Sequence, residues 1–326
     1  SSIEPDVVHL HWINYGYLHP RTKAKFRKPL LWTFHDMWPM TGGCHYASGC
    51  TRYEHECGAC PSLLSTQARD LSSRVWERKK AAWRDLSITI IAPSRWMADC
   101  ARRSSLFSTS RIEVIPNCLD TERFRPLDRA ACRNILGLPQ EAKIVLFVAM
   151  NAERDKRKGF DLLHAAACAL RERDPAGRLM ALVVGAESIG SDFPFPVRLL
   201  GLLRDEISLS LAYNAADVFV SASREDNLPN TVLEAMSCGT ACVGFNVGGM
   251  SDLIDHQETG LLAAPEDSQD LSERIASVLS DDQRARALGN AARERVLRQN
   301  APALVAHRHQ ELYRELIEAS SQLDQS

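Results

Sequence analysis

The sequence lacks long hydrophobic runs and an excess of charge of either sign. Its longest apolar stretches are short, such as Ile144 to Met150, and none approaches the roughly 18 residues that a membrane-spanning helix needs. This excludes an integral membrane protein, whereas peripheral contact with a membrane stays open. Lysine and arginine number 39 against 41 aspartates and glutamates, a formal net charge of −2, so no global field favours a nucleic acid as partner.

Cysteine is too rare and too scattered for a secreted disulfide scaffold. The chain has ten cysteines in 326 residues and no signal peptide ahead of them. We therefore expect the protein to be located in the reducing cytoplasm, which includes the inner face of the membrane. The hydrophobic fraction of 45% and the charged fraction of 25% are those of an ordinary globular protein and exclude disorder, collagen and coiled coil. The length indicates about two domains.

Short β-branched runs alternate with helical segments along the whole chain, which is the pattern of an α/β protein with parallel sheets. The predicted strands are 7–12, 30–34, 88–92, 112–115, 143–150, 179–185, 197–200, 218–221 and 241–245. The predicted helices are 64–85, 95–103, 160–173, 206–214, 231–237, 271–279 and a tail from 281 to about 317, interrupted at Pro302.

The chain divides at a stretch of little periodicity, residues 117–138, which is typical of a connection between domains. We predict a first domain in residues 1–125, a second in residues 126–302, and a C-terminal helix in residues 303–326 that packs back on the first. Two doubly wound domains that face each other would bind a ligand in a cleft between the carboxyl ends of their strands. A buried strand opens the chain almost at once, so we expect the first domain to be incomplete.

Two carboxylates, Asp226 and Glu234, lie eight positions apart where a predicted strand gives way to a helix. The helix is expected to start at Asn230 or Thr231, and the free N–H groups at its start form an anion site. Both carboxylates can face a ligand there, and they suit sugar hydroxyls because they accept strong, directional hydrogen bonds. A solvated acidic loop beside an amphipathic helix explains the same spacing.

Four basic residues lie between the strand that ends near Met150 and the helix that follows it: Arg154, Lys156, Arg157 and Lys158. Cations just beyond a strand end and just before a helix can clamp a pyrophosphate. A solvated run of charge is the alternative interpretation.

These motifs resemble the donor-binding signature of the retaining glycosyltransferases of family 4, which have the GT-B fold. That signature has two acidic residues, then Ala-Met, a small residue and Cys-Gly-Thr, matched here from Asp226 to Thr240, and a Gly-Gly loop, matched at 248–249. The resemblance implies that Glu234 holds the nucleotide ribose, that Asp226 holds the donor sugar, and that the helix start meets the diphosphate. Asp226 stands where the family usually has a glutamate.

The family also has a Lys-Gly element that binds donor phosphate together with an upstream arginine. Lys158 and Gly159 match this element. The loop ahead of it is longer than usual in the family, so Arg154 and Arg157 compete for the arginine role, and we select Arg154.

A histidine follows the second predicted strand, in Trp32-Thr-Phe-His-Asp-Met-Trp38. The family has a histidine at this place that lines the cleft near the donor sugar, and His35 matches it. The resemblance therefore implies a catalytic role for His35 beside Asp226, with a structural histidine as the alternative. His9 and His11 share one face of the first strand and are interpreted as sheet-edge or core histidines.

Four cysteines fall within 17 residues of one another after this histidine: Cys44, Cys50, Cys57 and Cys60. Four thiolates can close a tetrahedral zinc site and stabilise a loop too small for its own core, with His45 and His55 as substitute ligands. Reduced thiols in a polar loop are the alternative. The surrounding pattern resembles a branch of family 4 tied to colanic-acid-like exopolysaccharide synthesis.

The resemblance covers essentially the whole chain and implies a retaining glycosyltransferase that moves a sugar from a UDP- or GDP-sugar to a polysaccharide or lipid-linked glycan. Catalysis would rest on positive charge from Lys158, an arginine and a helix start, with no catalytic cofactor. A nucleotide-sugar-binding protein without transfer activity is the main alternative. A GT-B sugar-nucleotide epimerase is a third, against which the Asp226 and Glu234 signature argues.

Overall fold

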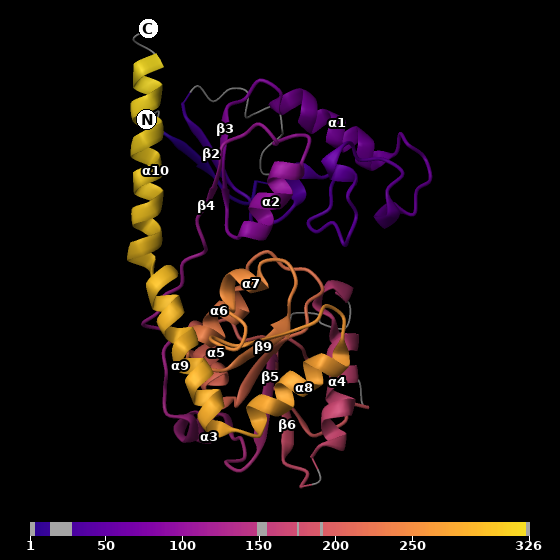
Figure 1. Ribbon diagram of the computed structural model, residues 1–326, viewed down its shortest axis with the longest axis vertical. Coiled ribbons are helices and arrows are strands. Elements are labelled where there is room, and N and C mark those ends of the chain that lie inside the picture. The colour runs from indigo at the N-terminus through magenta and orange to yellow at the C-terminus, as the bar shows by residue number, and fades with distance from the viewer. Residues whose placement is uncertain (1–3, 14–27, 149–154, 175, 190–191, 324–326) are drawn as a thin grey trace. The chain divides into compact units, whose positions relative to one another are not determined.

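The computed structural model describes residues 4–13, 28–148, 155–174, 176–189 and 192–323, and these form two compact units (Figure 1). The first unit comprises residues 1–116 and 305–326, and the second comprises residues 117–304. Within the described residues, no helix combines the length and the apolar character that crossing a bilayer requires.

The first unit is built on four parallel strands, whose order in the sheet is also their order along the chain. They are β1 (Val8–Leu10), β2 (Leu30–Thr33), β3 (Ile88–Ala92) and β4 (Ile112–Val114). Successive side chains point to opposite faces, so Trp32 and Ile90 pack into one buried cluster while Leu31 and Ile91 pack into another.

Different helices cover the two faces of this sheet. Helices α1 (Leu71–Trp83) and α2 (Arg95–Arg103) contribute to the first cluster through Trp83 and Met97. The C-terminal helix α10 (Pro302–Leu323) covers the other face, where Val305 and Leu312 pack against the strands (Figure 1). The last helix of the chain is therefore part of the first unit.

The second unit is built on six parallel strands in the order β10-β9-β8-β5-β6-β7. They are β5 (Lys143–Val148), β6 (Leu179–Val184), β7 (Val197–Leu199), β8 (Val218–Ser221), β9 (Cys242–Phe245) and β10 (Leu261–Ala263). The chain moves from β5 outward to β7, returns to the other side of β5 at β8, and moves outward again to β10. The direction of winding therefore reverses between β5 and β8.

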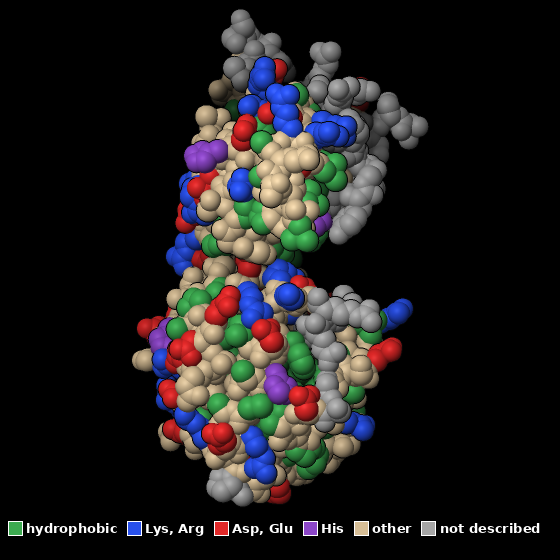
Figure 2. Space-filling view, turned by 90° about the vertical axis from the view of Figure 1, so that its right-hand side faces the viewer, with side chains coloured by type: hydrophobic (Ala, Val, Ile, Leu, Met, Phe, Trp, Pro, Cys, Tyr) green, Lys and Arg blue, Asp and Glu red, His purple; other side chains and the backbone are tan. Residues whose placement is uncertain are grey.

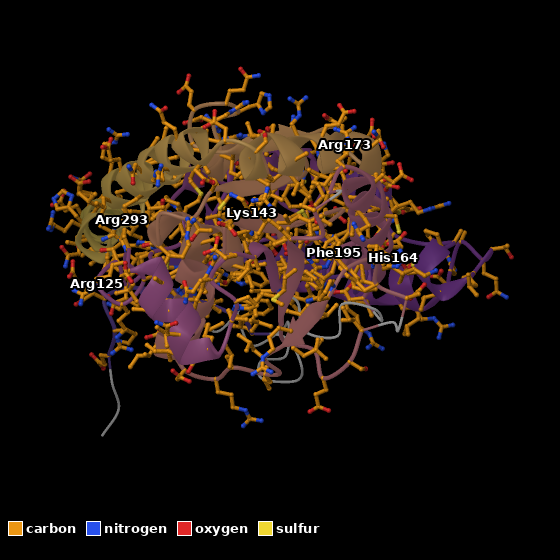
Figure 3. The ribbon with its side chains drawn as sticks, turned by 90° about the horizontal axis from the view of Figure 1, so that it is seen from below. Arg125, Lys143, His164, Arg173, Phe195 and Arg293 are labelled. Atoms are coloured by element: carbon orange, nitrogen blue, oxygen red, sulfur yellow. The ribbon has the colours of Figure 1, made fainter. Side chains whose placement is uncertain are left out.

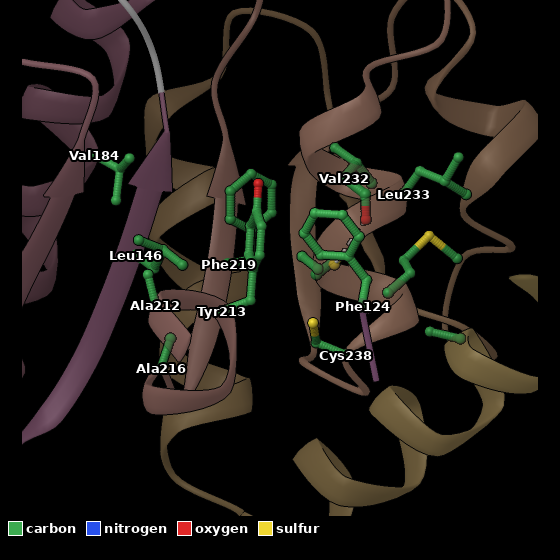
Figure 4. Close-up of a cluster of buried hydrophobic side chains, with 14 of the residues drawn as sticks. Phe124, Leu146, Val184, Ala212, Tyr213, Ala216, Phe219, Val232, Leu233 and Cys238 are labelled. Carbon is green, nitrogen blue, oxygen red and sulfur yellow. Dashed lines mark hydrogen bonds between the residues drawn. The ribbon is translucent and has the colours of Figure 1, made fainter. Parts of the chain in front are cut away.

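Helices cover both faces of the second sheet: α3 (Arg129–Leu136), α4 (Phe160–Glu172), α5 (Glu206–Ala215), α6 (Asn230–Ser237), α7 (Met250–Leu253), α8 (Ser268–Leu279) and α9 (Asp282–Gln299). One buried cluster joins the strands to α5 and α6, and Figure 4 shows Tyr213, Phe219 and Val232 within it. The other cluster joins the strands chiefly to α4 and α8, through side chains such as Leu163 and Leu271.

The elements differ from the sequence predictions at particular points. Helix α1 starts seven residues later than predicted, because a 3-10 turn covers Pro61–Leu63 and the side chain of Asp70 caps the helix at the N–H of Ser73. Helix α3 lies inside the stretch that was predicted to be an irregular connection, and β10 and α7 were not predicted. Helix α2 covers the predicted range 95–103, and the side chain of Ser94 caps it by accepting the N–H of Met97.

The division between the units also differs from the predicted boundary at residue 125. Residues 117–125 pack on the second unit, since Leu119 donates its N–H to the carbonyl oxygen of Asn300 over 3.0 Å and Phe124 is buried in the cluster shown in Figure 4. The connection is therefore part of the second unit's core.

Candidate functional site

The topology of the second sheet singles out one position for a ligand. In open parallel sheets, ligands bind beyond the carboxyl ends of the strands, at the point where the winding reverses. Here that point lies between β5 and β8, and the loops that follow these two strands carry the predicted residues Lys158 and Asp226. The fold and the sequence motifs thus indicate the same edge of the sheet.

The two loops fit closely against each other through their backbones. Gly159 has a positive φ of 66°, and a Cβ there would lie 2.0 Å from the carbonyl oxygen of Ala222. The N–H of Arg224 donates to the carbonyl oxygen of Arg157 over 2.8 Å, and the Arg224 guanidinium forms two hydrogen bonds with the carboxylate of Asp161. These contacts fix the basic loop beside the acidic one.

Asp226 lies at the centre of this arrangement and is almost fully buried, with 8% of its surface exposed. Its Oδ2 accepts hydrogen bonds from Lys158 Nζ at 2.9 Å and from Arg157 Nη1 at 3.2 Å. Arg157 also donates to the backbone carbonyl of Glu225 over 3.0 Å. The structure therefore brings together the predicted sugar carboxylate and the predicted phosphate cation.

The arginine found in this site is Arg157, whereas the sequence analysis selected Arg154. Arg154 lies outside the described residues. Its competitor Arg157 is described, and its guanidinium contacts Asp226 and Asp155. Arg157 is thus a member of the site that sequence reasoning kept only as the second choice, because the length of the loop hid its position.

Glu234 lies on α6 and pairs with a residue that the sequence analysis missed. The buried hydroxyl of Tyr213, on α5, donates to Glu234 Oε2 over 2.6 Å. Burial raises the pKa of Glu234 to about 7, and the hydrogen bond from Tyr213 opposes this rise. Tyr213 occupies a helical position of ordinary core spacing, so no local motif could reveal its role.

Helix α6 starts at Asn230, one of the two predicted positions. Within the described chain no side chain caps this start, where Pro229 is the N-cap residue. Asn230 accepts a hydrogen bond from the side-chain amide of Asn117 over 3.0 Å, and Thr231 follows in the first turn. The uncapped N–H groups and the helix dipole make this start suitable for an anion.

The Gly-Gly loop lies directly against Asp226. The N–H of Gly249 donates to the backbone carbonyl of Asp226 over 3.0 Å. Gly248 has a positive φ of 54°, and a Cβ there would lie 1.9 Å from the same oxygen. Glycine is therefore required where this loop supports the acidic turn.

His35 lies in the first unit, within a group of histidines on the face of the sheet that α10 covers. His11 Nδ1 and His35 Nε2 are 2.9 Å apart, and the ring of Trp12 stacks on His35 at a centroid distance of 5.4 Å. His9 contacts the hydroxyl of Tyr313, on α10, at 2.6 Å. His9 lies on β1, an edge strand of the first sheet, in keeping with its interpretation as a sheet-edge histidine. The contacts of His11 with His35 and of His9 with Tyr313 were not predicted, because they join segments that are distant in the sequence.

His9 and His35 are held neutral near pH 7. Burial, followed by the neighbouring histidines, lowers the pKa of His9 to about 3 and that of His35 to about 4. A neutral imidazole offers one N–H donor and one acceptor nitrogen. His35 can therefore take part in a neutral hydrogen bond with a hydroxyl.

The four cysteines of the predicted zinc site line one cavity of about 20 Å³ and are free thiols. Burial raises the pKa of Cys57 to about 11, and its sulfur accepts the N–H of Gly42 at 3.1 Å. The substitute ligand His45 is instead paired with Asp36 at 2.6 Å. Among the described residues, no three histidine, cysteine, aspartate or glutamate side chains are arranged to hold a metal ion, so the predicted zinc site at Cys44, Cys50, Cys57 and Cys60 is not formed in this structure.

A larger cavity, of about 450 Å³, lies at the opposite end of the second sheet, where β5 and β6 begin. Figure 3 labels two of its basic lining residues, Lys143 and Arg173. Both are neutralised locally, Lys143 by Asp282 at 2.7 Å and Arg173 by Glu273 at 3.2 Å. On the face shown in Figure 2, basic and acidic side chains are interspersed over each unit, in keeping with the low net charge.

Both units are Rossmann-like α/β units, and the second gathers cations and carboxylates where the winding of its sheet reverses. The family model described as "Glycosyl transferases group 1" matches residues 142–281, and the one described as "Glycosyltransferase Family 4" matches residues 1–123. Each of the two units thus contains a match to a glycosyltransferase domain model.

Curated relatives agree with this assignment. The chain is 33% identical over 203 residues to the D-inositol 3-phosphate glycosyltransferase of Saccharomonospora viridis, covering 57% of this chain and 46% of the relative. It is 28% identical over 305 residues to the enzyme of the same name from Nocardia farcinica, covering 87% and 61%. The chain thus spans about half the length of the first of these relatives. Their name concerns inositol phosphate, so the predicted link to exopolysaccharide synthesis receives no specific support.

Solved structures confirm the predicted α/β GT-B fold class. The structure of sucrose-phosphate synthase from Thermosynechococcus elongatus matches with a TM-score of 0.74 and 26% identity, covering 96% of this chain and 74% of that one. Anabaena HepE, solved in complex with UDP and glucose, matches with a TM-score of 0.64 and 19% identity, covering 89% and 72%.

Proposed function

We propose that this chain is the catalytic part of a retaining glycosyltransferase that takes a sugar from a nucleotide diphosphate donor, with UDP-sugars as the first choice. The observation that carries the proposal is the convergence of Lys158, Asp226 and the start of α6 at the winding reversal of the second sheet. A UDP donor is supported by HepE, a protein of the same fold that was solved with UDP-glucose.

In the proposed arrangement, the diphosphate lies at the uncapped start of α6, at Asn230 and Thr231, within reach of Lys158 Nζ. The leaving group of the reaction is a nucleoside diphosphate, whose negative charge grows as the sugar departs. Fixed cations and backbone N–H groups aimed at that charge stabilise the transition state more than the ground state. Lys158, with Arg157 or Arg154, and the helix start have this role.

The two carboxylates take the hydroxyl groups of the donor. Glu234, held by Tyr213 in one orientation, accepts hydrogen bonds from the ribose, and Asp226 accepts them from the transferred sugar. Asp226 has a shorter side chain than a glutamate at this position would have, and its salt bridges to Lys158 and Arg157 hold it against the phosphate site. We assign His35 a catalytic role in the transfer, as a neutral hydrogen-bonding group.

Retention of configuration follows from attack on the same face of the sugar from which the diphosphate leaves. The departing phosphate then accepts the proton of the attacking hydroxyl, the new glycosidic bond forms, and the bond from the anomeric carbon to phosphate breaks. The acceptor in this proposal is a polysaccharide or a lipid-linked glycan. The names of the curated relatives add a phosphorylated cyclitol as a second acceptor to be assayed.

A panel of UDP- and GDP-sugars, assayed for binding, hydrolysis and transfer, tests the proposal. Glu234→Ala and Lys158→Ala should each weaken donor binding roughly 10- to 100-fold while the fold stays intact, the effect of losing one charge-assisted hydrogen bond. Lys143→Ala, at the opposite end of the sheet, is the matched control and should bind normally. Tight donor binding without hydrolysis or transfer would instead support a nucleotide-sugar-binding protein, and unchanged affinity in both test variants would remove the assignment.

A further inference from the structure

We propose that the first unit carries a docking surface for a bilayer that contains anionic phospholipids, a surface that depends on no catalytic step of the proposed function. It consists of three leucines and three arginines at the turn before α1 and along its first turns: Leu63, Leu64, Leu71, Arg69, Arg74 and Arg78. We call these six residues the leucine–arginine surface.

The leucines of this surface are exposed to a degree that core packing does not explain. Leu64 is 93% exposed, Leu71 is 62% exposed and Leu63 is 48% exposed. Single exposed leucines are ordinary on a protein surface, but three within nine residues form a local apolar patch. In Figure 1 the loop ahead of α1 extends beyond the sheet of its own unit, so the patch lies on a projecting part of that unit.

The patch is held in place by the backbone. The N–H of Leu63 donates to the carbonyl oxygen of Cys60, and the N–H of Cys60 donates to Asp70 Oδ2 over 2.8 Å. Asp70 also caps α1, which brings the turn that carries Leu63 and Leu64 beside the helix start that carries Leu71. Leu64 itself has a positive φ of 51°, an uncommon conformation for leucine. The leucines are thus displayed by a preorganised turn, which reduces the entropy lost on binding.

Positive charge surrounds the patch. Arg69, Arg74 and Arg78 are all exposed, and within the described part of the chain none of them forms an ion pair. Leu71, Arg74 and Arg78 follow the i, i+3, i+7 spacing of one helix side, while α1 buries Trp76 and Trp83 on another. Glu77 is the one exposed acidic residue between 61 and 78.

This combination favours an anionic lipid surface over a protein partner. An exposed apolar turn can enter the headgroup region, and each basic residue near an anionic bilayer adds electrostatic attraction. A protein partner would be expected to meet aromatic anchors, whereas the exposed apolar side chains of this surface are leucines. Apolar insertion and charge attraction are the two signals that stable membrane association requires.

Sedimentation with lipid vesicles tests the proposal without any assay of transfer. Vesicles of phosphatidylcholine mixed with phosphatidylglycerol should bind the chain, and vesicles of phosphatidylcholine alone should bind it much more weakly. The variant Leu63→Ser with Leu64→Ser should lower affinity for the anionic vesicles by more than about tenfold. The variant Arg69→Gln, Arg74→Gln and Arg78→Gln should lower it on the order of 100-fold and remove most of its dependence on salt.

Matched variants in the second unit distinguish a specific docking surface from non-specific binding of exposed apolar and basic side chains to the vesicles. Ile135→Ser with Ile207→Ser replaces side chains that are 67% and 72% exposed, and Arg204→Gln, Arg286→Gln and Arg298→Gln make the same change of charge. Both should bind anionic vesicles as the unaltered chain does. Leu64→Ala alone cannot disturb the core and provides a test that does not depend on folding. Absence of binding to anionic vesicles, or equal losses in test and control variants, would overturn the proposal.

Discussion

Lys158 Nζ lies 2.9 Å from Asp226 Oδ2, so two residues expected to hold adjacent parts of a donor molecule, its diphosphate and its sugar, are paired with each other in the structure. Asp226 is almost fully buried, and Arg157 contacts the same oxygen atom. A diphosphate that reaches Lys158 must therefore compete with this carboxylate for the lysine. The pair holds Lys158 beside the proposed donor site, and in the proposed function Asp226 is expected to weaken the binding of a nucleotide that lacks the sugar.

Replacing Asp226 by asparagine should separate these two effects. Asp226→Asn should raise the affinity for UDP by about fivefold, because a competing carboxylate worth about 1 kcal/mol at a partly exposed pair is removed. Transfer from a UDP-sugar should fall, because the contact to the sugar is weakened. Calorimetry with UDP and with the UDP-sugar measures both. Asp155→Asn, which changes a more exposed partner of Arg157, is the control and should change UDP affinity less. A loss of UDP affinity in Asp226→Asn would contradict this account.

Nucleotide binding should depend on pH through Glu234. Burial raises its pKa to about 7, and only the carboxylate form accepts both hydroxyl hydrogen bonds, so UDP affinity should fall as the pH drops below 7 and level off above it. Tyr213→Phe removes a hydrogen bond that favours the charged form. The midpoint of the pH profile should therefore move upward, with a large loss of affinity at pH 7 and a small one at pH 9.

The control for that experiment is Tyr53→Phe, which removes a buried hydroxyl in the first unit. Its pH profile should match that of the unaltered chain. If Tyr213→Phe instead lost the same factor of affinity at every pH, Tyr213 would act through packing alone, and its role in setting the charge of Glu234 would be excluded.

Glycine at two positions should be required both for stability and for nucleotide binding. Gly159→Ala and Gly248→Ala each place a Cβ about 2 Å from a backbone oxygen, at Ala222 and at Asp226, and each is also strained at positive φ. We expect the free energy of unfolding to fall by about 2 kcal/mol or more, which is the cost of overpacking a core position, and we expect UDP binding to be lost. Gly137→Ala has a similar φ of 64° but no neighbour within 4 Å, so it should cost only about 1 kcal/mol and leave UDP binding intact. Chemical denaturation and calorimetry on the three variants check this order.

His35→Ala should lower turnover much more than donor affinity. The donor contacts proposed above all come from the second unit, whereas His35 lies in the first, hydrogen-bonded to His11. We expect the donor dissociation constant to stay within about twofold and kcat to fall at least about tenfold, the smaller end of what one positioned hydrogen-bonding group contributes. His309→Ala, at the outer side of the same group, is the control and should retain most of the activity. A His35→Ala variant with unaltered kcat would return His35 to a structural role.

Much of this site could be predicted because its residues stand in local patterns. Alternating β-branched runs predicted nine of the strands that pair in the two sheets, and the spacing of Asp226 and Glu234 around a strand-to-helix turn predicted where α6 begins. What could not be predicted depends on contacts between distant segments. Tyr213 contacts Glu234 from another helix, and Tyr313 contacts His9 across 304 positions of sequence.

The zinc prediction shows that a suitable sequence spacing does not by itself establish a metal site. Four cysteines at suitable spacing do line one cavity, but spacing cannot reveal that Asp36 pairs with His45 or that the sulfur of Cys57 accepts a backbone N–H. In the same way, helix α3 was not predicted because its eight residues are too few to show periodicity between two proline-containing turns. Its local signals are its caps alone: Asp128 accepts the N–H of Ala131 at the start, and Gly137 ends the helix in the left-handed conformation.

A crystal structure of the chain with bound UDP tests the central claim most directly. We expect the diphosphate to lie at the start of α6, within hydrogen-bonding distance of Lys158 Nζ. We expect the ribose to lie at the carboxylate of Glu234, and Asp226 to face the position of the sugar. Nucleotide bound elsewhere would contradict it, most plainly at the cavity of Lys143 and Arg173 at the opposite end of the sheet, as would a ribose that makes no contact with Glu234.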